Sequence, residues 1–301
     1  MRFVSFAENN QAGLGVETED GRVFGLNAND SGYPGDLLTL IQNGPDALTD
    51  AARILRNGRE IDMRRARWLP PLAQPGKIIC VGLNYVDHTS ESGFQQPDYP
   101  TLFARFSTSL IGHMDAMIRP RVSHQLDYEG EIAAVIGRGG RHIPKDSALD
   151  HVAGYSIFND GSVRDYQTKA PQWTVGKNFD GTGAFGPAFV TADALPPGCR
   201  GLRLQTRLNG AVMQDASADD MVFDVATLIA IISEAITLVP GDVIVTGTPA
   251  GIGLARKPPL FMKPGDICEI EVEGLGTLRN HIADEEPAGT AAQETRIPAM
   301  N

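Results

Sequence analysis

The chain has 301 residues, of which 42% are hydrophobic and 21% charged, so it has enough apolar side chains to fold into a globular protein. Its formal net charge of -11 argues against nucleic acid as the main partner, because a phosphate-binding surface needs clustered Lys and Arg. No apolar stretch reaches the roughly 18 residues that span a bilayer, and the N-terminus lacks a signal-peptide pattern, so we expect a cytoplasmic protein without a membrane partner.

The first seventy or so residues predict a small N-terminal α+β domain. Residues 1–30 alternate apolar and polar positions around glycines, as a hairpin or small meander does, and residues 35–56 have the apolar spacing of a helix. Prolines and a glycine in residues 68–76 interrupt regular structure. We therefore assign residues 1–72 to this domain.

Residues 73–284 form the predicted main domain, which is rich in strands. One long helix is predicted over Val225–Leu238. Because the strands outnumber the helices and do not alternate with them, the pattern predicts an α+β fold rather than a doubly wound sheet. The polar, unpatterned residues 285–301 predict a flexible tail. The predicted strands, chosen for β-branched content and flanking glycines, are residues 77–82, 130–137, 153–160, 186–192, 202–210, 241–247 and 266–274.

Several common catalytic motifs are absent or lack their required context. Residues 181–186 fit the G-x-G-x-x-G pattern, but Pro187 and a β-rich run follow where a dinucleotide site needs a helix. The sequence contains no Walker A loop, G-x-S-x-G elbow or H-E-x-x-H pair. Cys80 and Cys268 lie in apolar, strand-like runs, which favours reduced core thiols over a catalytic nucleophile.

A pair of glutamates offers a possible metal site. Glu129 and Glu131 flank Gly130 at the head of an apolar run, and residues two apart on a strand face the same side with Cα atoms roughly 6.6 Å apart. A divalent cation would remove the repulsion between their carboxylates, and Asp160 could add a third oxygen. The residues alone leave a second interpretation open, in which the pair lies on an exposed strand edge and Asp160 caps a helix.

An ordered set of motifs extends over most of the main domain. The sequence contains, in this order, VGLNYVDHTSESG, DYEGEIAAVIG, GYSIFNDGSVRDYQ, GKNFDGTGAFGP, TGTPAGIG and PGDICEIEVEGLGTLRN. The set resembles the fumarylacetoacetate hydrolase family from roughly Lys77 to Asn280. The resemblance implies the strand-rich catalytic fold of that family, a mixed β-roll or barrel with few helices, and a homodimer.

The same resemblance implies a metal site and a substrate site. It makes three carboxylates the ligands of one Mg²⁺ or Mn²⁺ per subunit, namely Glu129, Glu131 and Asp160. It places three further side chains at the bound substrate, namely Arg164, Gln167 and Thr248, the last in contact with the substrate carboxylate.

Three residues have implied catalytic roles. Lys177 is the cation that faces the bound oxo acid. His88 and Glu91 match the His–Glu pair that a mobile lid carries in the smaller family members, and Glu91 would orient the imidazole.

The chain departs from the family pattern at two positions. The founding enzyme supplies a fourth carboxylate where this chain has Val81, whereas the smaller members manage with three. Many relatives have an arginine where this chain has Leu83, and this difference bears on the distal group of the substrate.

Together these residues predict a hydrolase acting on carbon–carbon bonds in ketonic substances. The expected substrate is a small 2,4-dioxo acid, either an acylpyruvate or a diketo-deoxy sugar acid, which is cleaved to pyruvate and a carboxylic acid after His88 activates water. Two alternatives stay open. The same metal–enolate chemistry would serve an oxaloacetate decarboxylase or an oxo-acid tautomerase, and a protein of another class would bind metal without catalysis.

Overall fold

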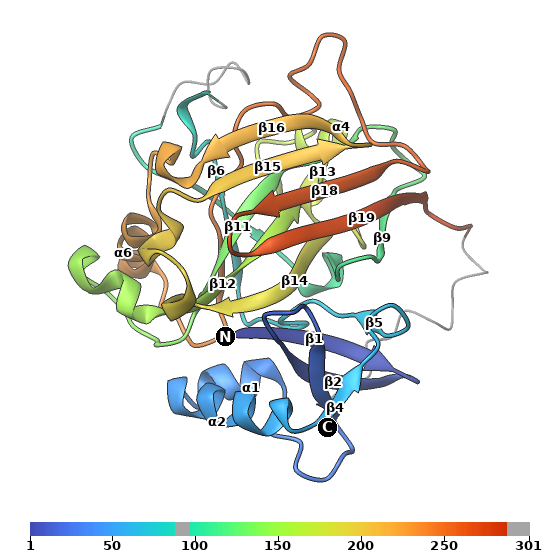
Figure 1. Ribbon diagram of the computed structural model, residues 1–301. Coiled ribbons are helices and arrows are strands. Elements are labelled where there is room, and N and C mark those ends of the chain that lie inside the picture. The colour runs from blue at the N-terminus through green and yellow to red at the C-terminus, as the bar shows by residue number, and fades with distance from the viewer. Residues whose placement is uncertain (88–96, 288–301) are drawn as a thin grey trace.

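The computed structural model describes residues 1–87 and 97–287, which form two large sheets and a few helices. The larger sheet has the strand order β4-β3-β2-β1-β14-β12-β11-β17-β6-β7, with β5 and β8 attached at β1 and β14. The smaller sheet has the order β16-β15-β18-β19-β9. Figure 1 shows the smaller sheet in front of the central strands of the larger one, with the N-terminal elements below. The predicted strand-rich α+β fold is confirmed, although neither described sheet closes into a barrel.

The N-terminal part is an antiparallel meander covered by two helices. The meander consists of β1 (Arg2–Glu8), β2 (Gln11–Glu17), β3 (Val23–Asn27) and β4 (Arg59–Ile61). The helices are α1 (Leu37–Gln42) and α2 (Pro45–Arg56), and they are separated at Gly44, whose φ of 94° interrupts the helical spacing.

β1 also pairs antiparallel with β14 (Gly183–Thr191), so the meander continues the sheet of the main part. The same core holds side chains from both parts, including Phe3 and Phe189, whose rings are 6.4 Å apart. The division at residue 72 stays a prediction.

The central strands of the larger sheet are buried on both faces. In β11 (Gly130–Ile136) every residue is buried: Ile132, Ala134 and Ile136 belong to one core cluster, and Ala133 and Val135 to another. This follows from the alternation of side chains along a strand whose two faces are both covered. The neighbouring strands are β12 (Val152–Asp160), β17 (Val243–Val245), β6 (Ile78–Gly82) and β7 (Thr101–Arg105).

The smaller sheet covers one face of these central strands. Leu204, Ile270 and Leu278 from this sheet lie in the same core cluster as Ile132. Its strands are β16 (Ala211–Ser217), β15 (Arg203–Leu208), β18 (Ile267–Val272), β19 (Gly276–Asp284) and β9 (Ala116–Arg119). The remaining short strands are β5 (Arg67–Trp68), β8 (Leu110–Ile111), β10 (Leu126–Asp127) and β13 (Ser162–Val163).

The predicted long helix forms but is shorter than expected. α6 (Val225–Ala235) begins after Asp224, whose side chain caps it by accepting from Thr227 N, and it ends at Ile236, where the backbone is extended. The prediction that it continues to Leu238 is therefore wrong. The other helices are α4 (Arg164–Gln167) and α5 (Thr174–Lys177), together with the 3-10 helices η1 (Ser107–Ser109), η2 (Lys145–His151), η3 (Ala192–Ala194), η4 (Pro197–Cys199) and η5 (Ala218–Asp220).

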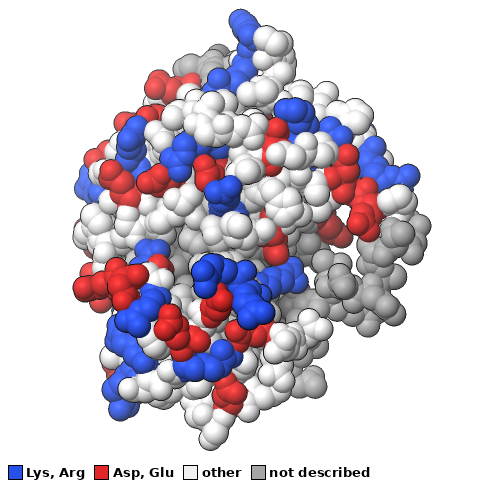
Figure 2. All heavy atoms as spheres, turned by 45° about the vertical axis from the view of Figure 1, so that its right-hand side comes forward, with Lys and Arg blue, Asp and Glu red and all other residues white. Residues whose placement is uncertain are grey.

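Of the described helices, none is long and apolar enough to cross a membrane. On the face seen in Figure 2, Lys and Arg side chains are interspersed with Asp and Glu rather than gathered into one basic area.

Candidate active site

Strand pairing brings three carboxylates together. Glu129 directly precedes β11, Glu131 lies within it, and Asp160 is the last residue of β12. The two strands are antiparallel with Gly130 opposite Asn159, and Asp160 N donates to Glu129 O at 2.9 Å. As a result one oxygen from each of the three buried carboxylates lies within 4.8 Å of the others.

Gly130 is required by the close approach of the smaller sheet. A Cβ atom at this position would lie 2.3 Å from Thr206 Oγ1 of β15 and 3.1 Å from Ile270 Cγ2 of β18. A contact of 2.3 Å does not occur for real side chains, so a larger residue here would force Thr206 or the backbone around it to move.

Lys177 ends α5 and points into the carboxylate group. Its Nζ lies 2.6 Å from Glu129 Oε2 and 2.7 Å from Asp160 Oδ2, and only 2% of the residue is exposed. Burial on its own would lower the pKa of Lys177, but the charges of Asp160 and Glu129 outweigh burial and raise it. Lys177 is therefore a fixed positive charge rather than a base.

Arg164 and Gln167 lie on α4, directly beside the carboxylates. Arg164 donates through Nε to Asp127 Oδ2 at 2.8 Å and through Nη1 to Gln167 Oε1 at 2.9 Å, and its Nη2 lies 2.6 Å from Glu129 Oε1. Burial acts to lower the pKa of Arg164, but Glu129 and Asp127 outweigh it and raise the pKa further. The guanidinium thus fixes the position of Glu129.

Arg105 is a site residue that the sequence analysis missed. It ends β7, is fully buried, and its Nη1 lies 2.5 Å from Asp160 Oδ1 and 3.1 Å from Gly161 O. Its Nη2 donates to Thr182 Oγ1 at 2.9 Å. The only sequence signal was a cation inside the apolar run TLFARF, and β7 itself was not predicted.

Asp127 was also missed, and it anchors a loop at the site. Its carboxylate accepts from the backbone N–H groups of Gly253 at 2.8 Å and Leu254 at 2.9 Å, in addition to Arg164. A single side chain thereby fixes both α4 and the loop after the T-G-T-P turn.

Thr248, in the T-G-T-P turn, lies against the metal-site strand. Its hydroxyl donates to Gly130 O at 3.0 Å and accepts from Gln214 Nε2 at 2.8 Å. Gln214, on β16, also donates to Pro249 O and accepts from Gly130 N, at 2.8 and 3.0 Å. This glutamine, another residue missed from the sequence, ties the turn to the strand between the two glutamates.

Glu131 differs from the other two carboxylates in its partners. It accepts from Gly247 N at 2.5 Å, whereas the ion pairs within residues 1–87 and 97–287 at this site involve Glu129 and Asp160 instead. Burial, together with the charges of Asp160 and Glu129, raises the pKa of Glu131 well above its ordinary value. Among the described residues Glu131 makes no ion pair, and with Glu129 and Asp160 it forms a donor set that fits a hard divalent cation.

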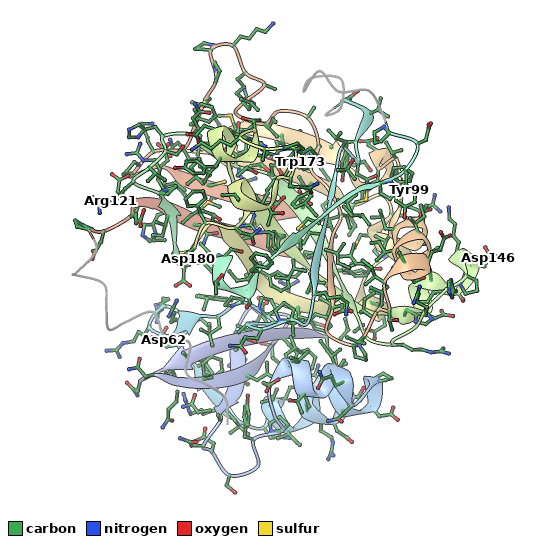
Figure 3. The ribbon with its side chains drawn as sticks, turned by 180° about the vertical axis from the view of Figure 1, so that it is seen from behind. Asp62, Tyr99, Arg121, Asp146, Trp173 and Asp180 are labelled. Atoms are coloured by element: carbon green, nitrogen blue, oxygen red, sulfur yellow. The ribbon has the colours of Figure 1, made fainter. Side chains whose placement is uncertain are left out.

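A cavity of about 90 Å³ opens beside the carboxylates. Phe103 and Trp173 form one wall, with ring centroids 5.5 Å apart at an interplanar angle of 68°. Figure 3 shows Trp173 in the upper, larger part of the molecule, far from Asp62 in the N-terminal part. The cavity is lined by Val81, Gly82, Leu83, Phe103, Glu129, Glu131, Arg164, Gln167, Thr168, Trp173, Lys177, Thr248, Ile252 and Leu254.

The structure thus brings together seven of the nine predicted site residues, while the predicted pair His88 and Glu91 lies outside the described residues. All three cysteines are free and buried, as expected for core thiols, and burial raises the pKa of Cys199 and Cys268 to about 12. Thiolate chemistry has no support here.

Sequence and structure comparisons extend over nearly the whole chain. Residues 77–283 match the family described as fumarylacetoacetate (FAA) hydrolase C-terminal. The human mitochondrial oxaloacetate tautomerase FAHD2A is 40% identical over 288 residues, which cover 94% of this chain and 91% of the human protein.

Two solved structures are similar over 95% of this chain and 100% of their own. The fumarylacetoacetate hydrolase of Exiguobacterium antarcticum has a TM-score of 0.83 at 36% identity. The maleylpyruvate hydrolase of Sphingobium sp. SYK-6, solved with manganese(II) and pyruvate, has a TM-score of 0.77 at 25% identity.

Proposed function

This chain belongs to the fumarylacetoacetate hydrolase family, and we propose that it is a metal-dependent hydrolase of 2,4-dioxo acids. The proposed reaction cleaves the bond between carbons 3 and 4 and yields pyruvate and a carboxylic acid. The observation that carries the proposal is the group of three buried carboxylates within 4.8 Å of one another, with the Lys177 ammonium against two of them.

The residues present fit a divalent cation. Glu129, Glu131 and Asp160 would hold one Mg²⁺ or Mn²⁺, whose charge would stabilise negative charge that develops on the 2-oxo oxygen. The manganese and pyruvate held by the Sphingobium relative support this assignment.

The protein's own side chains would supply orientation and a second positive charge. Lys177, held protonated by its neighbours, stabilises the developing enolate, and Arg164 keeps Glu129 in place. Gln167 and Thr248 line the cavity where the oxo acid would lie.

His88, oriented by Glu91, is the proposed base. It takes a proton from water while the water oxygen bonds to carbon 4. The bond between carbons 3 and 4 then breaks, its electron pair forms the enolate of pyruvate, and a proton returns to carbon 3.

Oxaloacetate tautomerisation is the second candidate, because the human relative with 40% identity carries that name. It uses the same enolate but breaks no carbon–carbon bond, and decarboxylation of oxaloacetate would use it as well. We also propose that the protein acts in the cytoplasm, although the human relative is named as a mitochondrial protein. A homodimer is likewise proposed.

Two assays on one preparation distinguish the candidates. With Mg²⁺ or Mn²⁺ present, the hydrolase should release pyruvate from acetylpyruvate in proportion to protein. The tautomerase would instead speed the loss of the enol absorbance of oxaloacetate without pyruvate release. Rapid tautomerisation with no cleavage of any acylpyruvate would replace our first proposal by the second.

A further inference from the structure

We propose that the site selects 2,4-dioxo acids whose distal substituent is uncharged and apolar, and discriminates against substrates that carry a second carboxylate at that end. This inference rests on the proposed function and concerns the part of the cavity farthest from the three carboxylates. Two independent observations carry it, namely the lining of the cavity and the balance of charge around it.

The cavity is lined by a group of charged residues and by a larger group of apolar ones. The charged groups are Glu129, Glu131, Arg164 and Lys177, and these contact one another or share the carboxylate group. The apolar side chains of the lining are Val81, Leu83, Phe103, Trp173, Ile252 and Leu254, and its uncharged polar side chains are Gln167, Thr168 and Thr248. A substrate chelated at the carboxylate end would therefore extend its distal group along this apolar wall.

The aromatic part of the wall is held rigidly. A Cβ atom at Gly82 would lie 2.4 Å from Trp173 Cζ3, so the indole packs directly on the backbone of β6. Phe103 lies edge-on to Trp173, and its ring centroid is 5.0 Å from Lys177 Nζ. The Phe103 ring thus contacts the Lys177 ammonium on one side and the Trp173 indole on another.

Leu254 is a lining residue open to solvent, with 40% of its surface exposed. Its backbone N–H donates to Asp127, which also binds Arg164, so the position of this leucine is tied to the charged end of the site. The loop therefore presents an alkyl side chain, rather than a polar one, to the distal part of a substrate.

The net charge of the site with its divalent ion is neutralised by a substrate with one negative charge, but not by a substrate with two. The described residues contribute four carboxylates, Asp127, Glu129, Glu131 and Asp160, and three cations, Arg105, Arg164 and Lys177. A divalent ion converts this excess of one negative charge into one positive charge, which a monoanionic 2-oxo acid neutralises.

The distal carboxylate of a dianionic substrate would lie next to the apolar lining without a counter-charge, and this would weaken binding. The three cations named are all engaged by carboxylates near the ion site. Among the described lining residues the cations are Arg164 and Lys177, and both pair with carboxylates of the ion site rather than facing the apolar lining alone.

A matched pair of substrates tests this inference. 2,4-Dioxoheptanoate and 2,4-dioxoheptanedioate differ only in a methyl group or a carboxylate at carbon 7. With Mn²⁺ present, the wild-type kcat/KM for pyruvate release should be about tenfold or more higher for the monoacid. Leu254→Arg should reduce or reverse this ratio by improving the diacid, whereas the uncharged control Leu254→Gln should not improve the diacid.

The outcomes separate the inference from the proposed function. Pyruvate release with equal or higher kcat/KM for the diacid overturns the distal selectivity and leaves hydrolysis intact. If neither compound is cleaved, hydrolysis fails, and calorimetric binding of both compounds to the Mn²⁺-loaded protein decides the selectivity. Tighter binding of the monoacid then supports it, and equal or tighter binding of the diacid refutes it.

Discussion

The Arg105 guanidinium lies 2.5 Å from Asp160 Oδ1, and neither side chain has exposed surface. Asp160 also accepts from Lys177 through its other oxygen, so two cations from β7 and α5 hold one carboxylate in a fixed orientation. Because a buried charge without its partner is costly, this ion pair should matter for both folding and metal binding.

Arg105→Met should reduce the free energy of unfolding by about 3–5 kcal/mol, since Asp160 would lose a buried counter-charge. The hydrogen bonds that the guanidinium donates to Thr182 Oγ1 and Gly161 O would be lost as well. Arg105→Lys keeps the charge but not the fork and should lose less. Urea unfolding in chelator measures both variants. A loss below about 1 kcal/mol for Arg105→Met would contradict this role of the pair.

Glu131→Gln should stabilise the metal-free protein at pH 8. Burial and the neighbouring carboxylates raise the folded-state pKa of Glu131 well above its ordinary value, so the native state binds this proton more tightly than the unfolded state does. The contribution of the Glu131 carboxyl to the free energy of unfolding of the wild type therefore falls as the pH rises from about 4.5 through the folded-state pKa. The advantage of Glu131→Gln over wild type should grow over that range.

Unfolding free energies of wild type and Glu131→Gln in chelator, at pH 5 and pH 8, test the sign of this effect. Saturating Mn²⁺ should reverse the order at pH 8, because the wild type alone then gains binding energy from all three ligands. An advantage for Glu131→Gln that shrinks with rising pH would contradict the assigned cause.

Gln214→Glu should lower kcat/KM by about 10–100-fold, because the donors to Thr248 Oγ1 and Pro249 O are lost while the acceptor for Gly130 N stays. Steady-state pyruvate release measures the loss of kcat/KM. The Mn²⁺ affinity shows whether the substitution disturbs the turn or the metal-binding glutamates. If Gln214 acts on the turn, KM should rise and Mn²⁺ affinity should change little. A loss of Mn²⁺ affinity alone would place its effect at the glutamates instead.

His88→Ala should lower the hydrolysis of an acylpyruvate by roughly 10²–10⁴-fold, since a positioned base contributes about that factor. Decarboxylation of oxaloacetate needs no activated water and should fall much less. Lys177→Ala should impair both reactions, because both develop the same negative charge. Equal losses in both reactions for His88→Ala would mean that His88 has a role other than water activation.

The sequence predicted most of the carboxylate site because its members lie in short motifs. Glu129 and Glu131 are two residues apart, and the ordered motifs supplied Asp160 and Lys177. The strands were predictable for the same local reason, since β-branched runs between glycines, as in β17, mark buried strands.

Arg105, Asp127 and Gln214 could not be predicted, because their roles depend on strand pairing between distant segments. Arg105 meets Asp160 across 55 residues of chain, and Gln214 meets Gly130 across 84. The end of α6 was placed too late because Ile236 and Leu238 continue the apolar spacing, although the backbone is already extended at Ile236.

Pyruvate release from acetylpyruvate by chelator-treated protein, before and after Mn²⁺ is returned, tests the central claim most directly. We expect no release without metal, full recovery with Mn²⁺ in the wild type, and no recovery in Glu131→Ala, which loses one of the three carboxylates within 4.8 Å. Full activity in the chelator-treated wild type, or full recovery in Glu131→Ala, would contradict it.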